Sequence, residues 1–231
     1  MDLSLLEVNL GYTFENKKLL FEAITHRSYL NENRSWQFPH NERLEFLGDA
    51  VLELVVTEYL FSRFGLEEGI LTSYRAALVN TQSLAEVSQD IGVNDFLLLS
   101  RGEARDSNSK GRLEILGNAF EALVGALYLD GGYGVAKDFL NRILTHRIEG
   151  IIEKGLYKDP KSRFQEEAQA RVGETPVYKS LDEWGPDHEK QFLIGVYLGG
   201  EEIAQGVGRS KQDAEVNAAQ NAIEKRGWNN H

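Results

Sequence analysis

One stretch near the N-terminus, residues 40–52, most constrains what this chain can fold into. It has the pattern of an apolar helix, yet it carries three carboxylates, Glu42, Glu45 and Asp49. At about 100° per residue, these side chains fall within about 60° of one another on one helix face. Acidic groups surrounded by apolar surface are unfavourable unless positive charge lies against them. A hard divalent cation with oxygen ligands is the simplest such partner.

A second segment offers matching oxygen donors. Asn118 and Glu121 are three residues apart in another apolar run, so they share one face of a helix. Glu68, at a helix–loop junction, is a further carboxylate. A buried ion pair with an arginine is the simpler interpretation for any one of these acids alone. Their clustering on two helices favours a metal site instead, as in helical bundles.

The first 150 residues have the periodicity of successive helices, at about 41–63, 72–87 and 113–129, without strand-like alternation. The pattern then changes. Asp159 and Pro160 predict a helix start, three strand-like runs follow, and Ser210 predicts the cap of a last helix. The strand-like runs are 176–180, 190–197 and 202–206.

The predicted fold class is therefore multidomain: an all-α domain followed by a small α+β domain with the order α-β-β-β-α. We place the first domain at residues 1–152, a linker at 153–158 and the second domain at 159–228.

Composition limits the partners. The net charge is −11, and residues 156–231 carry 10 Lys and Arg against 13 Asp and Glu, a net charge of −3. A polyanionic partner must therefore meet local basic patches or bound cations. Cysteine is absent, which excludes disulfides and thiolate sites and suits a reducing cytoplasm. No apolar run reaches the length of a membrane span.

The segment Asn41–Ala50 resembles the signature of the ribonuclease III family almost letter for letter. Four further blocks resemble the rest of that endonuclease domain in the same order: 25–29, 68–69, 75–80 and 119–126. The resemblance implies a cytoplasmic homodimer that cuts double-stranded RNA with Mg²⁺, for which Mn²⁺ substitutes. It also implies 5′-phosphate and 3′-hydroxyl products, in ribosomal RNA and messenger RNA processing.

By position in that resemblance, Glu45, Asp49 and Glu121 correspond to metal ligands, and Asp49 and Glu121 are also catalytic. Glu42 and Glu68 correspond to catalytic acids in a valley formed by the dimer. Phe46 corresponds to a residue that inserts into the partner subunit.

One position departs from the family pattern, because Asn118 stands where an aspartate is expected. An amide still offers one oxygen ligand but no charge, whereas Mg²⁺ favours anionic oxygen. We predict weaker Mg²⁺ binding and slower cleavage, with RNA binding retained. Two accounts of Asn118 are open: a natural variant that tolerates asparagine, or a substitution that traps uncut RNA.

The second domain resembles the double-stranded RNA-binding domain, which reads the shape of A-form RNA through its minor grooves and phosphates. The resemblance implies RNA contacts by Gln165, Gln169, His188 and Lys211. Gln212 stands where the family usually has a second basic residue, which predicts a reduced salt dependence of binding.

Three functions are thus open to a chain of this kind. The first is a metal-dependent endonuclease for double-stranded RNA. The second is a double-stranded RNA-binding protein whose catalytic half is weakened at Asn118. The third, a helical metal-storage or sensor protein, is disfavoured by the RNA-binding tail.

Overall fold

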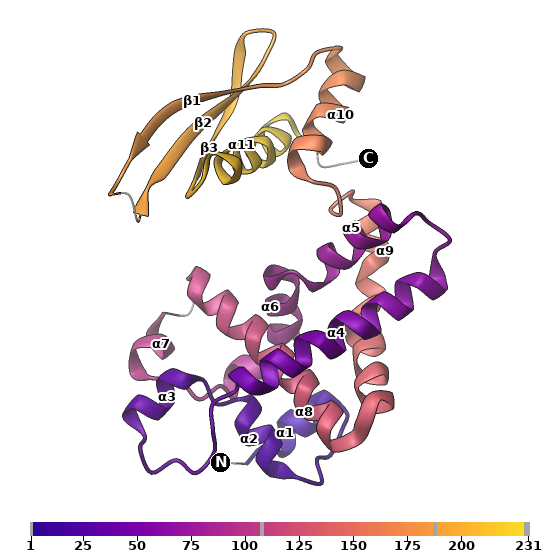
Figure 1. Ribbon diagram of the computed structural model, residues 1–231, viewed down its shortest axis with the longest axis vertical. Coiled ribbons are helices and arrows are strands. Elements are labelled where there is room, and N and C mark those ends of the chain that lie inside the picture. The colour runs from indigo at the N-terminus through magenta and orange to yellow at the C-terminus, as the bar shows by residue number, and fades with distance from the viewer. Residues whose placement is uncertain (1, 107–108, 187–188, 229–231) are drawn as a thin grey trace. The chain divides into compact units, whose positions relative to one another are not determined.

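A computed structural model describes residues 2–106, 109–186 and 189–228 (Figure 1). The chain divides into two compact units, Met1–Glu149 and Gly150–His231. The boundary between them falls within the short helix α9 (Ile148–Glu153). Each unit is described below by itself.

The first unit is helical, as predicted, and contains no strand among its described residues apart from an isolated bridge between Thr25 and Leu98. Its helices are α1 (Ser4–Leu10), α2 (Lys17–Ala23), α3 (Arg27–Glu32), α4 (Glu42–Arg63), α5 (Glu68–Val79), α6 (Thr81–Asp90), α7 (Arg101–Arg105) and α8 (Lys110–Ile143), with two short 3₁₀ helices, η1 (Val93–Asp95) and η2 (Thr145–Arg147).

Helices α4 and α8 pack against each other at the centre of this unit (Figure 1). The buried face of α4 includes Leu52, Val55 and Val56, and that of α8 includes Phe120 and Leu123, all without exposed surface. These positions recur every three or four residues, which is the spacing of one helix face. The acidic residues of α4 therefore lie at the margin of its apolar face.

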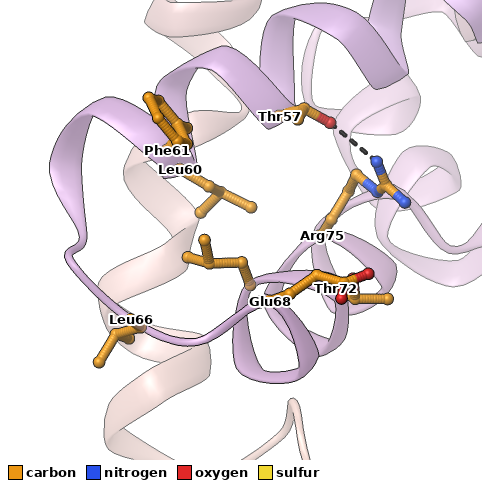
Figure 2. Close-up of a pocket in the computed structure, with 8 residues that line it drawn as sticks. Thr57, Leu60, Phe61, Leu66, Glu68, Thr72 and Arg75 are labelled. Atoms are coloured by element: carbon orange, nitrogen blue, oxygen red, sulfur yellow. Dashed lines mark hydrogen bonds between the residues drawn. The ribbon is translucent and has the colours of Figure 1, made fainter.

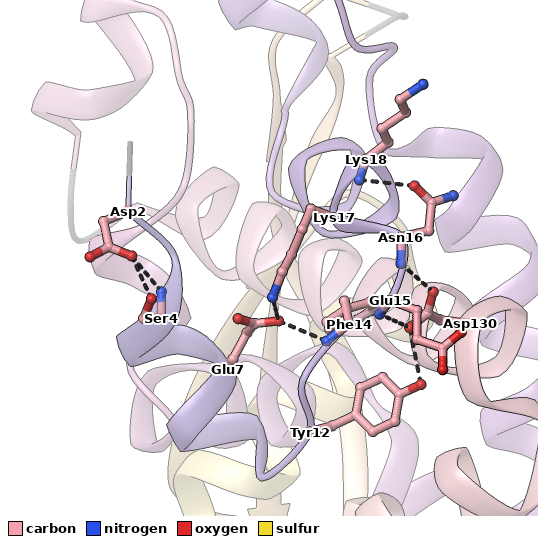
Figure 3. A network of polar contacts seen from close by, with 10 residues as sticks. All are labelled: Asp2, Ser4, Glu7, Tyr12, Phe14, Glu15, Asn16, Lys17, Lys18 and Asp130. Atoms are coloured by element: carbon pink, nitrogen blue, oxygen red, sulfur yellow. Dashed lines mark hydrogen bonds and ion pairs between the residues drawn. The ribbon is translucent and has the colours of Figure 1, made fainter.

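Polar contacts fasten the N-terminal loop to α8 (Figure 3). The carboxylate of Asp130 accepts hydrogen bonds from the Tyr12 hydroxyl at 3.0 Å and from the backbone N–H groups of Glu15 and Asn16 at 2.8 and 2.9 Å. These bonds keep the pKa of Asp130 below its ordinary value, although burial opposes them. The loop before α2 is thus held in place by an acid far away in sequence.

Two helix boundaries differ from the sequence expectation. The single helix expected at about 72–87 is two helices, because Asn80 adopts an extended conformation and its side chain accepts the Ser83 N–H at 2.9 Å to cap α6. The helix expected to end near residue 129 continues as α8 to Ile143, across a kink at Gly132 (φ 78°, ψ −179°). Glycine tolerates this conformation because it has no Cβ.

The second unit has the predicted α-β-β-β-α order. Its elements are α10 (Pro160–Val172), β1 (Val177–Trp184), β2 (Gln191–Leu198), β3 (Glu201–Gly208) and α11 (Lys211–Arg226). The three strands form an antiparallel sheet in the order β1-β2-β3. The predicted caps are present, since Asp159 accepts the N–H groups of residues 161 and 162 and Ser210 accepts that of Asp213.

The core of the second unit lies between the sheet and its two helices. Small side chains on one face of α11, including Ala214 and Ala218, let this helix approach β3 closely. A Cβ on Gly206 would lie 2.2 Å from the backbone nitrogen of Ala218, so the two backbones touch there. Phe164 of α10 stacks on Trp228 at 5.4 Å between ring centroids and closes the end of this core.

Within the described ranges, no helix has the length and apolar character that crossing a membrane requires.

Candidate active site and nucleic-acid interface

The start of α4 is fixed by Asn41, which is 2% exposed. Its amide nitrogen donates to the carbonyl of Ala23 at 3.2 Å, and its backbone N–H donates to the carbonyl of Thr25 at 2.9 Å. The backbone N–H of Glu45 in turn bonds to the carbonyl of Asn41 at 2.9 Å. The first turn of the acidic helix is therefore anchored to the segment between α2 and α3.

The acids of α4 lie beside the point where α4 and α8 touch. A Cβ on Gly48 would lie 1.7 Å from the carbonyl oxygen of Glu121, and one on Gly125 would lie 2.4 Å from the carbonyl oxygen of Leu44. Only glycine permits backbones to approach this closely. Asp49 follows Gly48 directly, so this helix crossing brings carboxylates of both helices together.

Three carboxyl groups at this crossing interact electrostatically. Burial, followed by the charges of Asp49 and Glu45, raises the pKa of Glu121 to about 7. Burial, followed by the charges of Glu42 and Asp49, raises the pKa of Glu45. Burial and like charge both disfavour the ionised forms. The structure thus brings Glu45, Asp49 and Glu121 together, although they are far apart in sequence.

Arginine does not neutralise this cluster. No ion pair among the described residues involves Glu45, Asp49 or Glu121. Arg75 pairs instead with Glu53, at 3.3 Å, and Arg112 donates to the side chain of Asn94. The simpler interpretation, a set of buried ion pairs, is wrong for these three acids.

The donor chemistry of the crossing suits a hard divalent cation, because carboxylate and amide oxygens are its preferred ligands. Asn118 lies on α8 one turn before Glu121 and is partly buried. Among the described residues, however, no three His, Cys, Asp or Glu side chains form a group arranged to hold a metal ion. The acids are neighbours rather than a complete set of ligands, and metal binding here stays a prediction.

Glu42 differs from Glu45 and Asp49 in having cationic side chains beside it. It is exposed, and its carboxylate lies 3.2 Å from Nη1 of Arg27 and 3.8 Å from Nδ1 of His40. Its charge contributes to the raised pKa of Glu45. Glu42 is therefore next to the cluster at the crossing but faces cationic side chains and solvent.

Glu68 lies in a separate hollow between α4 and α5 (Figure 2). The hollow has a volume of about 410 Å³. Its lining is mainly apolar and consists of Thr57, Leu60, Phe61, Leu66, Glu68, Leu71, Thr72 and Arg75. The hydroxyl of Thr57 accepts a hydrogen bond from Arg75 at 2.9 Å across it. The residues around Glu68 differ from those at the contact between α4 and α8. Within one chain, Glu68 therefore lies apart from the predicted catalytic acids at that contact.

Phe46 projects from the first two turns of α4 and is 83% exposed. Such exposure is unusual for a large aromatic side chain in an otherwise apolar helix. This exposure leaves the ring of Phe46 accessible for contact with another molecule.

Three of the four predicted RNA-binding residues of the second unit, Gln165, Gln169 and Lys211, are exposed. Gln165 and Gln169 lie one turn apart on α10, on the side opposite the buried Phe164, and Lys211 is the first residue of α11. Gln165 also lines a hollow of about 330 Å³ together with Gln212 of α11. His188 lies outside the described residues.

Sequence reasoning missed the glycines that create the crossing. Gly125 sits within a long buried stretch of α8 that otherwise has a side chain at almost every position. A glycine inside such a helix costs stability relative to alanine, and this cost was the signal that could have identified a close helix contact.

Comparisons with known proteins agree with both units. Residues 16–148 match a family model described as ribonuclease-III-like, and residues 160–226 match the double-stranded RNA binding motif. The chain is 43% identical to ribonuclease 3 of Campylobacter jejuni, over 96% of each chain. It is 44% identical to ribonuclease 3 of Magnetococcus marinus, over 95% of this chain and 91% of that one. The chain belongs to the ribonuclease III family.

Solved structures extend this likeness to the helical unit. The nuclease domain of ribonuclease III from Campylobacter jejuni is 42% identical, with a TM-score of 0.54 over 62% of this chain and 95% of that one. The description of that structure refers to a region involved in dimer formation. A second structure of the same domain is 39% identical, with a TM-score of 0.53. The first unit is thus the nuclease part of a ribonuclease III, and the second is its RNA-binding part.

Proposed function

We propose that this chain is an endonuclease that hydrolyses phosphodiester bonds of double-stranded RNA with the help of Mg²⁺. The observation that carries the proposal is the meeting of three mutually interacting carboxyl groups at the contact of Gly48 with α8, in a chain that also holds an RNA-binding domain. The ribonuclease III family generally uses a divalent metal. Mg²⁺, with Mn²⁺ as a substitute, is our proposal for this chain.

The residues that would hold the cation are Glu45, Asp49, Asn118 and Glu121. When bound, the cation would lower the pKa of the attacking water and stabilise charge on the scissile phosphate. Glu121 titrates near neutral pH in its partly buried position. Its raised pKa favours the protonated form until positive charge arrives. Asp49 and Glu121 are the groups we assign to catalysis at this crossing.

We propose that two copies of the chain complete the active site. Thr57, in the hollow that contains Glu68, is 15 residues from Glu42 along α4, or about 22 Å at 1.5 Å per residue. A single chain therefore keeps the two acids apart. Phe46 lies one turn from Glu42 on the same face of α4. If Phe46 of one copy entered the hollow of another, its Glu42 would approach the second copy's Glu68.

The apolar lining of the hollow supports this arrangement, because it would cover the ring of Phe46 and exclude water. The relative from Campylobacter jejuni has a region of its nuclease domain involved in dimer formation. We propose Phe46 as a dimer contact on these grounds. Sedimentation of the wild type and of Phe46→Ala tests it, since the variant should be mainly monomeric.

The RNA-binding domain would hold the duplex through Gln165, Gln169, His188 and Lys211. Neutral hydrogen-bonding side chains suit the 2′-hydroxyls of a minor groove, and lysine suits phosphates. We propose products with 5′-phosphates and 3′-hydroxyls, and a role in ribosomal RNA and messenger RNA processing in the cytoplasm. We retain residues 1–152, 153–158 and 159–228 as the nuclease domain, linker and RNA-binding domain.

A second function follows from Asn118. An amide in place of a carboxylate supplies less charge to the cation, so the chain would bind duplex RNA and cut it slowly. The remaining acids argue for residual cleavage, because Glu45, Asp49 and Glu121 are all present at the crossing.

One experiment separates the two functions. A long RNA duplex is incubated with the full chain in Mg²⁺, in Mn²⁺ and in a chelator, and a single strand of the same sequence serves as control. Metal-dependent fragments of the duplex alone support the nuclease. A duplex that is shifted in a gel but stays intact at every metal concentration supports the RNA-binding protein.

A further inference from the structure

The aromatic ring of Phe192 has two lysines beside it. Nζ of Lys190 lies 5.6 Å from the centroid of this ring, and Nζ of Lys211 lies 5.9 Å from it. Both distances are within the range of cation–π attraction. The first lysine comes from the loop before β2 and the second from the start of α11, so one ring connects two segments that are far apart in sequence.

The backbone around Phe192 explains why the two lysines meet. In the sheet, Phe192 pairs with Gly208 at the end of β3. A Cβ on Gly208 would lie 2.4 Å from the backbone nitrogen of Ala214 and 2.6 Å from Cβ of Asp213, so α11 begins in direct contact with that strand. Lys211 is thereby held near the ring by a rigid junction.

An acidic residue on the neighbouring strand β1 contacts Lys190. Glu183 of β1 pairs with Phe192 across the sheet, and its carboxylate lies 3.0 Å from Nζ of Lys190. An ion pair between two partly exposed side chains of this kind contributes little to stability. A phosphate oxygen can therefore replace Glu183 as the partner of Lys190 at little cost.

The pair of lysines matters because the start of α11 offers little positive charge for binding RNA phosphates. The first turn of α11 contributes Lys211, neutral Gln212 and acidic Asp213, so it offers one positive side chain. Lys190 and Arg209 also line one hollow of about 640 Å³ next to it. Residues 156–231, which contain this domain, have a net charge of −3 and can attract RNA only where cations are concentrated.

We propose that Lys190 is a second phosphate-binding residue of the RNA-binding domain, and that Phe192 positions it beside Lys211. This inference rests on the proposed binding of duplex RNA. Gln212, which follows Lys211, is neutral, so Lys190 supplies the second positive charge beside the ring of Phe192. RNA backbone charge, rather than base sequence, is what such a pair recognises.

The salt dependence of binding tests the proposal. Affinity of the full chain for an RNA duplex is measured between 50 and 200 mM salt in a chelator, for the wild type and for Lys190→Gln. One lost phosphate contact should reduce the slope of log affinity against log salt by about one. The ratio of wild-type to variant affinity should then change about threefold over this salt range.

Lys179→Gln is the matched control. It removes the same charge from a lysine of the same domain that also lies over an aromatic ring, at 4.5 Å from the centroid of Tyr197. Lys179 is not near Phe192 in the sheet, since it pairs with Gly195. We expect this variant to keep the wild-type slope. Equal slopes for Lys190→Gln and Lys179→Gln would overturn the assignment of Lys190.

Lys211→Gln tests the proposed binding of duplex RNA independently of Lys190. It should reduce the slope whether or not Lys190 contributes, so a lower slope in Lys211→Gln alone overturns only the present inference. Failure of the wild type to bind the duplex would overturn the proposed function and this inference together. Phe192→Leu tests whether the ring positions Lys190. In the Phe192→Leu background, Lys190→Gln should reduce the affinity for RNA less than it does in the wild type. An equal reduction in both backgrounds would overturn the positioning role of the ring.

Discussion

The two units of the chain prepare their functional groups in opposite ways. In the nuclease unit, carboxylates are brought together by a contact between two helix backbones, and burial together with the neighbouring charges raises the pKa of Glu121. In the RNA-binding unit, the candidate groups are exposed side chains on α10 and α11. The nuclease site therefore depends on backbone geometry, whereas we expect the RNA-binding surface to tolerate changes at single side chains.

The largest effect is expected where the helix backbones touch. Gly125→Ala places a Cβ 2.4 Å from the carbonyl oxygen of Leu44, so α4 and α8 must separate. Overpacking of this kind costs on the order of 1–3 kcal/mol or more. We expect a large drop in thermal stability and loss of cleavage.

The control for this change lies in the same helix. A Cβ on Gly134 meets no atom within 4 Å, and its backbone is helical, so Gly134→Ala should be neutral or stabilising. Thermal melts and cleavage assays of both variants check the prediction. If Gly125→Ala melted and cleaved like Gly134→Ala, the contact between the helices would not control the site.

The next effect concerns the pH dependence of stability. Glu121 has a pKa of about 7 in the folded chain and an ordinary value of 4.5, so the folded state holds its proton more tightly between these values. The contribution of Glu121 to stability therefore falls as pH rises from about 4.5 to 7. Glu121→Gln removes this loss, so without metal the variant should gain on the wild type over that range, by on the order of 2 kcal/mol.

Urea unfolding in a chelator at several pH values measures this gain. Added Mg²⁺ should stabilise the wild type more than the variant, because the cation favours the ionised carboxyl groups. A stability difference that stays constant between pH 4.5 and 8 would contradict the assignment of a raised pKa to Glu121.

A smaller effect is expected at Asn118. Asn118→Asp adds a negative charge one turn from Glu121, so cleavage at limiting Mg²⁺ should increase by about tenfold, which corresponds to about 1.4 kcal/mol of transition-state stabilisation. RNA binding in a chelator should not change. The matched control is Asn141→Asp, which adds the same charge on α8 beyond the kink at Gly132. An equal response of both variants would reject a specific role for Asn118.

The smallest effect is expected on the exposed face of the second unit. Gln165→Ala removes a neutral hydrogen-bonding group from α10, so affinity for duplex RNA should fall by several-fold, or about 1 kcal/mol. The salt dependence should stay the same, because no charge is lost. Filter binding at several salt concentrations measures both quantities. A change in the salt slope would mean that Gln165 acts through neighbouring charges and not through a minor groove.

Particular elements show how far the sequence could lead. Local patterns predict the cap at Asp159, the cap at Ser210 and a helix at about 41–63, and the structure confirms both caps and a helix at Glu42–Arg63. The break at Asn80 was missed, because its extended backbone conformation and the bond to Ser83 interrupt a continuous apolar periodicity. The strands β1 and β3 are also longer than expected, since pairing in the sheet extends both of them beyond their apolar runs, whereas β2 has the expected length.

Local sequence patterns are sufficient to predict the family, the α-β-β-β-α order of the second unit and the acidic face that carries Glu42, Glu45 and Asp49. Which acids meet depends on how the helices pack. Glu121 joins Glu45 and Asp49 because Gly48 and Gly125 let two backbones touch, whereas Glu68 lies in a different hollow. Helical periodicity specifies one face of one helix, but only packing specifies which faces of distant segments come into contact.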